Sequence, residues 1–204
     1  FKKIGDLRSA IKRGNYVAAI LSTGIAAEMY ERTKKGLVEV SPVSLDGIYV
    51  VANGYNKNDF RLSYLVKKNV VCMDKNSTAD QVWQKVMTDG QQSISSVKMK
   101  YVNSYEASAK PFASWAALVI CTEPYASRLT KLSEVFKILD LAELYRENGH
   151  GQVPTDVLVV SKKMAKYRTN DVRVMKNEYE TALSAVGKTK ANLVFYNHSN
   201  RGIQ

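Results

Sequence analysis

The apolar run from Ala117 to Cys121, which ends abruptly in the polar turn Thr122-Glu123-Pro124, most constrains what this chain can fold into. The run lacks the alternation of apolar and polar residues that a half-exposed strand shows, so it predicts a buried parallel strand covered by helices on both faces. Thr122 and Glu123 follow at the carboxyl end of that strand. In open α/β sheets ligands bind at this end, beside helix N-termini whose N–H groups are free. The turn is therefore a candidate ligand-binding loop.

Glu123 also has a purely structural interpretation. Pro124 suits the first turn of a following helix. A carboxylate beside a helix N-terminus stabilises that helix by about 0.3–1 kcal/mol without any ligand. At the level of sequence, the binding role and the structural role of Glu123 both stay open.

A second copy of the strand, polar turn and helix pattern lies earlier, between Ala18 and Tyr30. Thr23 occupies the place in this copy that Thr122 occupies in the other. Each copy follows a helical segment, at 4–13 and at 105–112. Two similar units of this kind predict two similar lobes.

Other local patterns predict the remaining elements. Ser77 and Asp80 form a capping-box-like start of a helix that Asp89-Gly90 ends. An amphipathic docking helix is predicted to begin at Thr169 or Asn170, and 146–151 is predicted to be a loop. Apolar runs bounded by glycine and polar residues predict further strands at 47–52, 69–73, 97–102, 136–139 and 154–161.

These elements suggest how the chain is divided. The polar, basic segment 56–68 indicates a connection between lobes and a first hinge, and the strand 154–161 indicates a second hinge. We expect residues 1–56 to form part of the first lobe and residues 57–152 to form the second. Residues 153–204 are expected to return to the first lobe and to include the docking helix.

Composition limits the classes of partner. With 204 residues and 45% hydrophobic content the chain can bury a core as one large domain or as two small lobes. The formal charge of +11 suggests nucleic acid, an anionic wall or membrane surface, or acidic ligands. Nucleic-acid binding is the weaker interpretation, because no basic stripe with interleaved aromatic residues is present. The basic residues come as scattered pairs, which we expect to be solvated: Lys2-Lys3, Lys34-Lys35, Lys67-Lys68 and Lys162-Lys163.

Catalytic signals are weak. Cys72 and Cys121 lie in predicted buried strands, which favours inert core thiols over a metal site or a reactive pair. The only histidines, His150 and His198, lie in loop-like regions, and the chain has no G-x-S-x-G elbow, P-loop or C-x-x-C motif. We therefore predict no catalytic residues, no metal site and no cofactor.

The order of these motifs resembles the substrate-binding proteins of ABC importers, specifically the nitrate/sulfonate/taurine and thiamine-precursor type with the type 2 periplasmic-binding fold. The most specific segment is Glu123-Pro124-Tyr125-Ala126. The resemblance implies an α/β fold of two lobes, each a mostly parallel sheet flanked by helices, joined by crossover strands. It further rests on residues 14–23, 47–51, 75–78, 122–126 and 153–160.

The resemblance also implies a function. In this family the lobes close on a small molecule and present it to a membrane permease, with no chemical reaction. It implies a polar, anionic or heteroaromatic ligand, permease and ATPase partners, and no nucleic acid. It implies an extracytoplasmic place, in the periplasm or on the outer face of the cell membrane as a lipoprotein. Carried onto this sequence, the resemblance puts Asp46 and Thr155 near the crossovers and lets Tyr125 cover an apolar part of the ligand. It implies that the ligand-facing loops consist of Ser22, Thr23, Gly24, Asn76, Ser77, Thr78, Thr122 and Glu123.

Several positions depart from the pattern of this family. Val17 and Ala117 stand where the family often carries Asp, and Ser114 stands where Gly is expected. The first strand and helix of the family would lie upstream of Phe1, so we expect an N-terminal piece, and any lipid anchor, to precede this chain. The alternatives are a diverged sensor or partner module of the same fold, and a biosynthetic enzyme of the thiamine-pyrimidine or menaquinone type.

Overall fold

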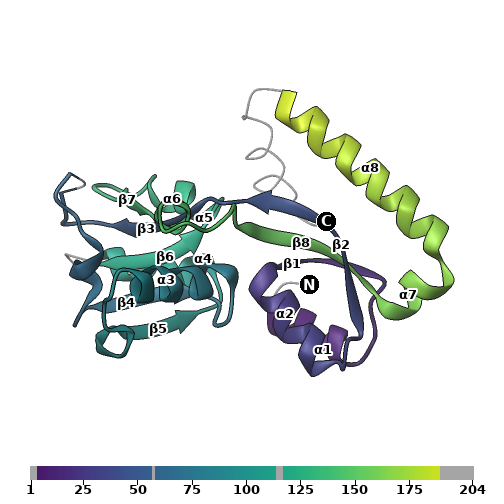
Figure 1. Ribbon diagram of the computed structural model, residues 1–204. Helices are drawn as coiled ribbons and strands as arrows, with labels where there is room; N and C mark the ends of the chain where they lie inside the picture. Colours follow the sequence, from purple (N-terminus) through teal and green to yellow (C-terminus); the bar gives the residue numbers. More distant parts are fainter. Residues whose placement is uncertain (1–3, 57, 114–116, 189–204) are drawn as a thin grey trace.

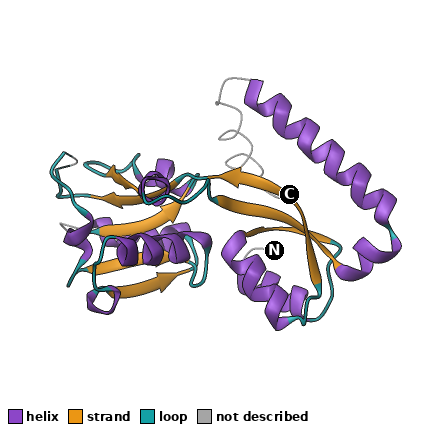
Figure 2. Cartoon of the chain, viewed as in Figure 1, coloured by secondary structure: helices purple, strands orange, loops and turns teal. Residues whose placement is uncertain are grey.

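A computed structural model describes residues 4–56, 58–113 and 117–188, which form two α/β lobes of unequal size (Figure 1). Each lobe has its own sheet, and the chain passes from the smaller lobe to the larger and back (Figure 2). The two-lobed α/β architecture predicted from the sequence is therefore confirmed.

In the smaller lobe, the described strands pair antiparallel in the order β1 (Ala18–Ser22), β8 (Pro154–Ser161), β2 (Leu37–Leu45). Helices α1 (Ile4–Lys12) and α2 (Thr23–Arg32) pack on one face through a core that includes Ile11, Leu21, Ile25 and Val159. After the short α7 (Lys162–Tyr167), the long α8 (Thr169–Lys188) runs on the other side of the sheet from α1 and α2 (Figure 1).

In the larger lobe, the strands lie in the order β5 (Lys98–Val102), β4 (Asn69–Met73), β6 (Leu118–Thr122), β3 (Ile48–Ala52), β7 (Phe136–Asp140). Helices α3 (Thr78–Asp89) and α6 (Leu141–Glu147) cover one face of this sheet, and α4 (Tyr105–Ala109) and α5 (Tyr125–Leu129) cover the other. The 3-10 turns at Leu62–Leu65, Ile94–Ser96 and Lys110–Ala113 complete the described elements.

Strand β6 confirms that the opening apolar run is buried on both faces. Leu118 and Ile120 pack into the core beneath α3, whereas Val119 and Cys121 pack into the core beneath α5. Burial raises the pKa of both Cys72 and Cys121, as expected for inert core thiols.

The expectation of a mostly parallel sheet in each lobe is wrong. Strand β4 is parallel to β5 and β6, but β3 is antiparallel to β6 and β7, and β8 is antiparallel to both of its neighbours. The physical reason is the crossover. Strand β2 leaves the smaller lobe and β8 re-enters it, so these two adjacent strands necessarily run in opposite directions.

The crossing between lobes lies earlier than the sequence predicted. Strand β3 pairs with β6 and β7, so the chain enters the larger sheet before the expected boundary at residue 56. The segment 56–68 is not the first hinge, because Phe60 and Leu65 are buried in the core of the larger lobe. The second predicted hinge, at 154–161, is the strand β8 that begins at the crossing.

The two passages of the chain are held side by side by hydrogen bonds. The Asp46 N–H donates to the Val153 carbonyl (2.7 Å), and the Val153 N–H donates to Asp46 Oδ1 (3.0 Å). The Thr155 hydroxyl donates to the Asp46 carbonyl. We call residues 45–47 and 153–155 the hinge, and Asp46 and Thr155 both lie in it, as the sequence predicted.

Two short helices were missed. Helix α6 begins at Leu141, where Asp140 Oδ1 accepts from the Glu143 N–H (3.0 Å), and it ends at Glu147, inside the segment predicted to be a loop. Helix α7 similarly begins after Ser161, whose side chain accepts from the Met164 N–H (3.1 Å). No helix in the described ranges has the length and apolar character needed to cross a membrane.

Candidate functional site

The N-termini of α2 and α3 meet where the two lobes touch. Gly24, in the first turn of α2, lies against the backbone that leads into α3. A Cβ at this position would lie 2.4 Å from the Asn76 carbonyl oxygen and 2.9 Å from the Thr78 nitrogen. A Cβ essentially never lies within 3.0 Å of a backbone atom, so the close approach requires glycine. The resemblance makes both loops ligand-facing, and that role stays a prediction.

The hydroxyl groups in this contact are already bonded within the protein. The Gly24 N–H donates to Thr78 Oγ1 (3.1 Å), and that hydroxyl donates to the Thr155 carbonyl (2.8 Å). The Thr23 hydroxyl donates to the Pro154 carbonyl. Thr78 is only 5% exposed. Thr78 of the larger lobe therefore bonds to both the smaller lobe and the hinge, and Thr23 bonds the smaller lobe to the hinge.

Ser22 and Ser77 cap the two helices. Ser22 Oγ accepts from the Ile25 N–H (3.4 Å), and Ser77 Oγ accepts from the Asp80 N–H (3.3 Å) and donates to the Met73 carbonyl (3.0 Å). These hydroxyls satisfy helix N-H groups that would otherwise be free.

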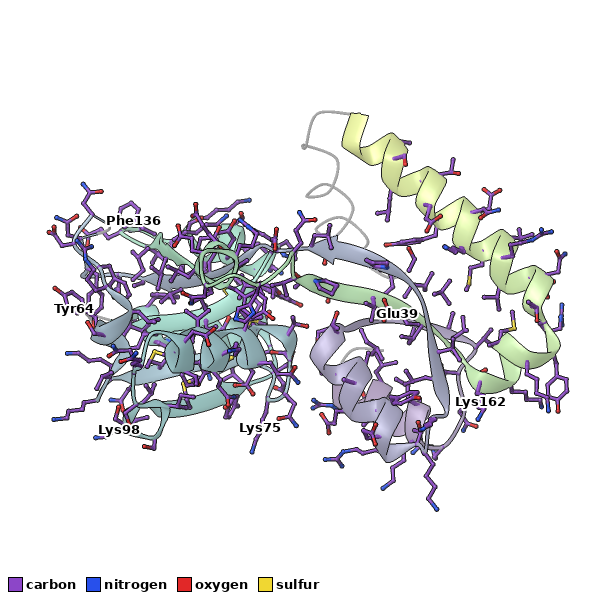
Figure 3. The ribbon with its side chains drawn as sticks, viewed as in Figure 1. Glu39, Tyr64, Lys75, Lys98, Phe136 and Lys162 are labelled. Atoms are coloured by element: carbon purple, nitrogen blue, oxygen red, sulfur yellow. The ribbon has the colours of Figure 1, made fainter. Side chains whose placement is uncertain are left out.

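A polar cluster extends the contact between lobes. Arg8 of α1 donates from Nη2 to Glu28 Oε2 (3.0 Å) and to the Lys75 carbonyl (2.9 Å). Asn76 donates from Nδ2 to the same Glu28 oxygen (3.3 Å). Figure 3 shows Lys75 at the side of the larger lobe that faces the smaller one. No sequence pattern pointed to Arg8 or Glu28, because both lie in ordinary amphipathic helices.

Glu123 makes the contacts of a structural residue. Its carboxylate accepts from the Ser127 N–H (3.1 Å) and hydroxyl (3.0 Å) in the first turn of α5, and it pairs with Lys137. Its own N–H donates to the Gly47 carbonyl (2.9 Å) at the hinge. The local bonds thus account for Glu123 without a ligand, and its binding role stays a prediction.

Asp46 also has partners in the protein. Besides its bonds across the hinge, its carboxylate pairs with Arg146 of α6. By contrast, the hydroxyl groups of Thr122 and Tyr125 make no hydrogen bond within the part of the chain that the structure describes. The ligand-binding role of Thr122 and Tyr125 stays a prediction.

Two half-buried carboxylates whose charges act on Tyr125 were not predicted as site residues. Asp74 follows β4, and Asp156 lies in β8. Burial raises the pKa of both carboxyl groups. The charge of Arg8 partly offsets this rise for the pKa of Asp74, and the hydrogen bond from the Ser44 hydroxyl partly offsets it for the pKa of Asp156. Burial also raises the pKa of Tyr125, and the charges of Asp74 and Asp156 raise it further. Asp156 accepts from Ser44 Oγ (2.7 Å), whereas Asp74 Oδ1 is buried with no hydrogen bond among the described residues.

The position of Asp74 in the sequence was a recognisable sign of a site residue. Asp74 directly follows a buried strand, as Thr122 ends another, and β4 and β6 are parallel neighbours. The two residues therefore share one edge of the sheet. Across the described ranges, no group of three His, Cys, Asp or Glu side chains is placed to hold a metal ion.

Comparisons by sequence give no relatives. No protein-family model matches the chain. No curated protein matches it either.

Solved structures, in contrast, match along most of the chain. The alkanesulfonate-binding protein SsuA from Xanthomonas axonopodis pv. citri, bound to MOPS, is 16% identical with a TM-score of 0.67, over 90% of this chain and 62% of that one. The periplasmic aliphatic sulphonate-binding protein SsuA from Escherichia coli is 12% identical with a TM-score of 0.67, over 91% and 61%. The zinc-bound ligand-binding component of an ABC-type import system from Staphylococcus aureus is 14% identical with a TM-score of 0.64, over 85% and 57%.

The chain thus spans about three fifths of the length of these proteins. Identities of 12–16% show a common fold. The resemblance that the motifs predicted is confirmed at that level: this chain has the two-lobed fold of the solute-binding proteins of ABC-type importers.

Proposed function

We propose that this chain is the solute-binding component of an ABC importer, which captures a small molecule between its lobes and presents it to a permease. The single observation that carries the proposal is the junction of the lobes. There, Thr122 and the unpartnered Oδ1 of Asp74 lie at one edge of the larger sheet, and the charges of Asp74 and of Asp156 in the smaller lobe both act on Tyr125. Small-molecule sites are commonly built from a few such convergent polar groups between domains.

The hinge supports movement of the lobes. Closure around a ligand requires backbone rotation at few residues, and the chain crosses between the described parts of the lobes only at 45–47 and 153–155. Direct bonds between lobes, such as Gly24 to Thr78, are few and lie at helix ends. The proposal places the protein outside the cytoplasm, in the periplasm or anchored by lipid on the outer face of the membrane, and assigns it no reaction.

The carboxylates restrict the class of ligand. Of the polar, anionic and heteroaromatic ligands that the resemblance implies, an anion would face the charges of Asp74 and Asp156 in a partly buried setting, where repulsion is weakly screened. We therefore expect a neutral or cationic ligand with N–H donors, such as an amino-substituted heterocycle or an amine.

A thermal-shift screen tests this function, since a ligand that binds only the folded state raises the melting temperature. The probes are pyrimidines, thiamine precursors, basic amino acids, sulfonates and nitrate. We expect a shift with a donor-bearing probe, and a smaller one in Asp74→Asn and Thr122→Ala. The control is Asp59→Asn, which changes an exposed carboxylate elsewhere on the larger lobe. A shift with sulfonate or nitrate alone would contradict the ligand class.

A second function is favoured by a specific observation. The hydroxyls of Thr23 and Thr78 bond to the protein itself, to the carbonyl groups of Pro154 and Thr155 in the hinge. A sensor or partner module that no longer binds a solute would have this arrangement. A flat screen on well-folded protein would reject the solute-binding proposal in favour of that module.

A further inference from the structure

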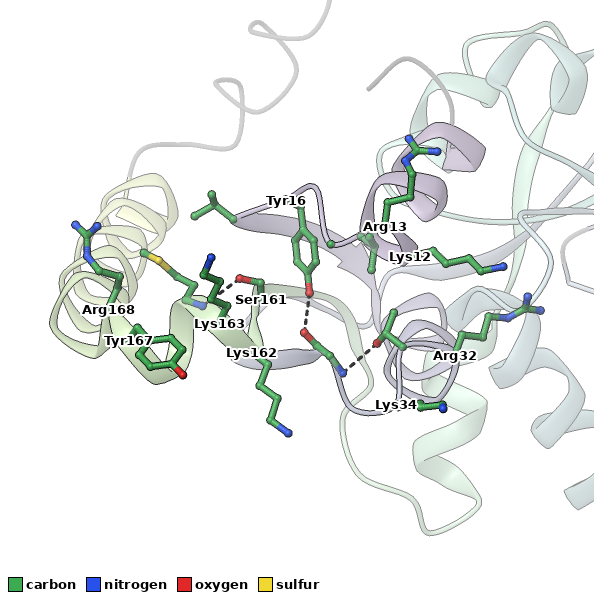
Figure 4. Close-up of a pocket in the computed structure, with 16 residues that line it drawn as sticks. Lys12, Arg13, Tyr16, Arg32, Lys34, Ser161, Lys162, Lys163, Tyr167 and Arg168 are labelled. Carbon is green, nitrogen blue, oxygen red and sulfur yellow. Dashed lines mark hydrogen bonds between the residues drawn. The ribbon is translucent and has the colours of Figure 1, made fainter.

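A basic pocket lies at the end of the smaller lobe that points away from the larger lobe. It has a volume of about 990 Å³ and opens between the end of α1, the loop after α2 and the start of α7 (Figure 4). None of the described residues that line it is acidic. The cations among these lining residues are Lys12, Arg13, Arg32, Lys34, Lys162, Lys163 and Arg168.

Tertiary structure gathers these cations from distant parts of the sequence. In Figure 4, Lys12, Arg32 and Lys34 lie on one side of Tyr16, and Lys163 and Arg168 lie on the other. Along the sequence these basic residues come as scattered pairs. Lys34, Lys162 and Lys163 nevertheless line one pocket, because antiparallel β2 and β8 bring the start of one strand next to the end of the other. All three are exposed, as expected of solvated lysines.

Most of this charge is not neutralised by the protein. Arg32 pairs with Glu28 (2.8 Å), and Arg168 pairs with Asp171. The other cations of the pocket, such as Lys34 and Lys162, form no ion pair within the described part of the chain. Like charges that converge on a concave surface repel one another and raise the local concentration of anions.

Interaction with the helix dipole explains the positions of only some of the cations in the pocket. Lys12 and Arg32 end α1 and α2, where a cation interacts favourably with the helix dipole. Lys162 and Lys163 occupy the first turn of α7, where the dipole disfavours a cation. The helix dipole therefore does not explain these two lysines.

The walls of the pocket are tied together. The Tyr16 hydroxyl donates to the Gly36 carbonyl (3.2 Å), and the Lys162 N–H donates to the same carbonyl (2.9 Å). The Thr33 hydroxyl donates to the Met29 carbonyl (2.6 Å) and accepts from the Gly36 N–H (3.1 Å). These bonds hold the loop that carries Lys34 against the start of α7.

We propose that this pocket binds phosphate groups of a multiply charged anion. The same chemistry is offered by an array of anionic phospholipid headgroups and by a soluble polyphosphate. Tyr167 and Val17 at its rim are 66% and 61% exposed, which suits a membrane surface, where such side chains enter the interfacial region beside the headgroups. The inference does not depend on the solute-binding function, because the pocket lies at the opposite end of the lobe.

The test uses the purified chain at low and moderate salt with three probes. These are phosphatidylglycerol/phosphatidylcholine vesicles against phosphatidylcholine vesicles in sedimentation, sodium tripolyphosphate in calorimetry, and a single-stranded oligonucleotide in a retention assay. The variant is Lys162→Gln/Lys163→Gln. The matched control is Lys98→Gln/Lys100→Gln, which removes the same charge from exposed positions on β5 of the larger lobe. Lys98 is labelled in Figure 3.

We expect the pocket variant to weaken binding to anionic vesicles or to tripolyphosphate by about tenfold or more, and the control to change it little. Binding to vesicles alone identifies headgroups as the source, and binding to tripolyphosphate identifies a soluble anion. The proposal is overturned if neither probe binds at low salt, if the control loses as much as the pocket variant, or if only the oligonucleotide binds.

Discussion

At the residue scale, the junction of the lobes combines groups that bond to each other with groups left without a partner. The Thr78 hydroxyl accepts a hydrogen bond from the Gly24 N–H and donates one to the Thr155 carbonyl, so it already has partners within the protein. Asp74, in contrast, has a buried oxygen with no bond in the described part of the protein. A buried carboxylate without full compensation costs stability and is retained where binding needs it.

The pH dependence of stability follows from the direction of the shifts. Burial raises the pKa of Asp74 and Asp156 above the ordinary value of 3.8, so the folded state binds protons more tightly than the unfolded state. The stability that these two groups contribute through proton binding is therefore fully present below about pH 3.8 and is lost as the pH rises through their folded-state pKa.

We accordingly expect Asp74→Asn to be more stable than the parent chain at pH 7 and to lose this advantage at pH 3. Urea unfolding of both proteins at the two pH values measures the difference in the free energy of unfolding. Asp59→Asn, at an exposed site, serves as the control and should show no such pH dependence. An equal effect of Asp74→Asn at both pH values would contradict the explanation.

At the element scale, α3 links the site to the core of the larger lobe. Ser77 fixes its start, and its apolar face, which includes Trp83, Val86 and Met87, is buried against the sheet. The Trp83 ring N–H donates to Asp80 Oδ1 (2.9 Å), which also accepts from Tyr101 (2.9 Å). The position of the helix N-terminus at the junction is thus determined by packing behind it.

Trp83→Ala should lower the free energy of unfolding by about 3–5 kcal/mol, because it leaves a large cavity in a close-packed core. Lys85→Ala on the exposed face of the same helix removes only a surface ion pair with Asp89, and its effect should stay within about 1 kcal/mol. Chemical unfolding monitored by circular dichroism compares the two. Equal losses would show that α3 does not anchor the lobe.

At the scale of the whole molecule, the relative position of the lobes depends on a small set of hydrogen bonds around the hinge. Thr78→Val keeps the shape of the side chain but removes the hydroxyl. The Gly24 N–H and the Thr155 carbonyl then lose their partner, at a cost of about 1–3 kcal/mol for a buried polar group.

We expect this variant to have a larger radius of gyration in small-angle X-ray scattering than the parent chain, because the lobes separate so that water can solvate the freed groups. Thr88→Val, near the end of the same helix, is the matched control, since its hydroxyl bonds only within α3. An unchanged radius in Thr78→Val would mean that other contacts determine the arrangement of the lobes.

What the sequence alone determined is local. Apolar runs, capping residues and helical periodicity indicated β6, β8, α2 and α3, since the interactions that form these elements join residues a few positions apart. The repeat of strand, polar turn and helix also predicted two lobes. Short elements such as α7 were missed because one turn of helix carries too little periodicity.

Only the tertiary structure decided what those elements bring together. The bond between Gly24 and Thr78 joins residues 54 positions apart, and that between Thr78 and Thr155 joins residues 77 apart. The approach of Asp156 to Tyr125, and the gathering of Lys34 and Lys162 around one pocket, likewise follow from strand order and direction. No local pattern encodes such contacts, because they depend on how the two sheets are assembled.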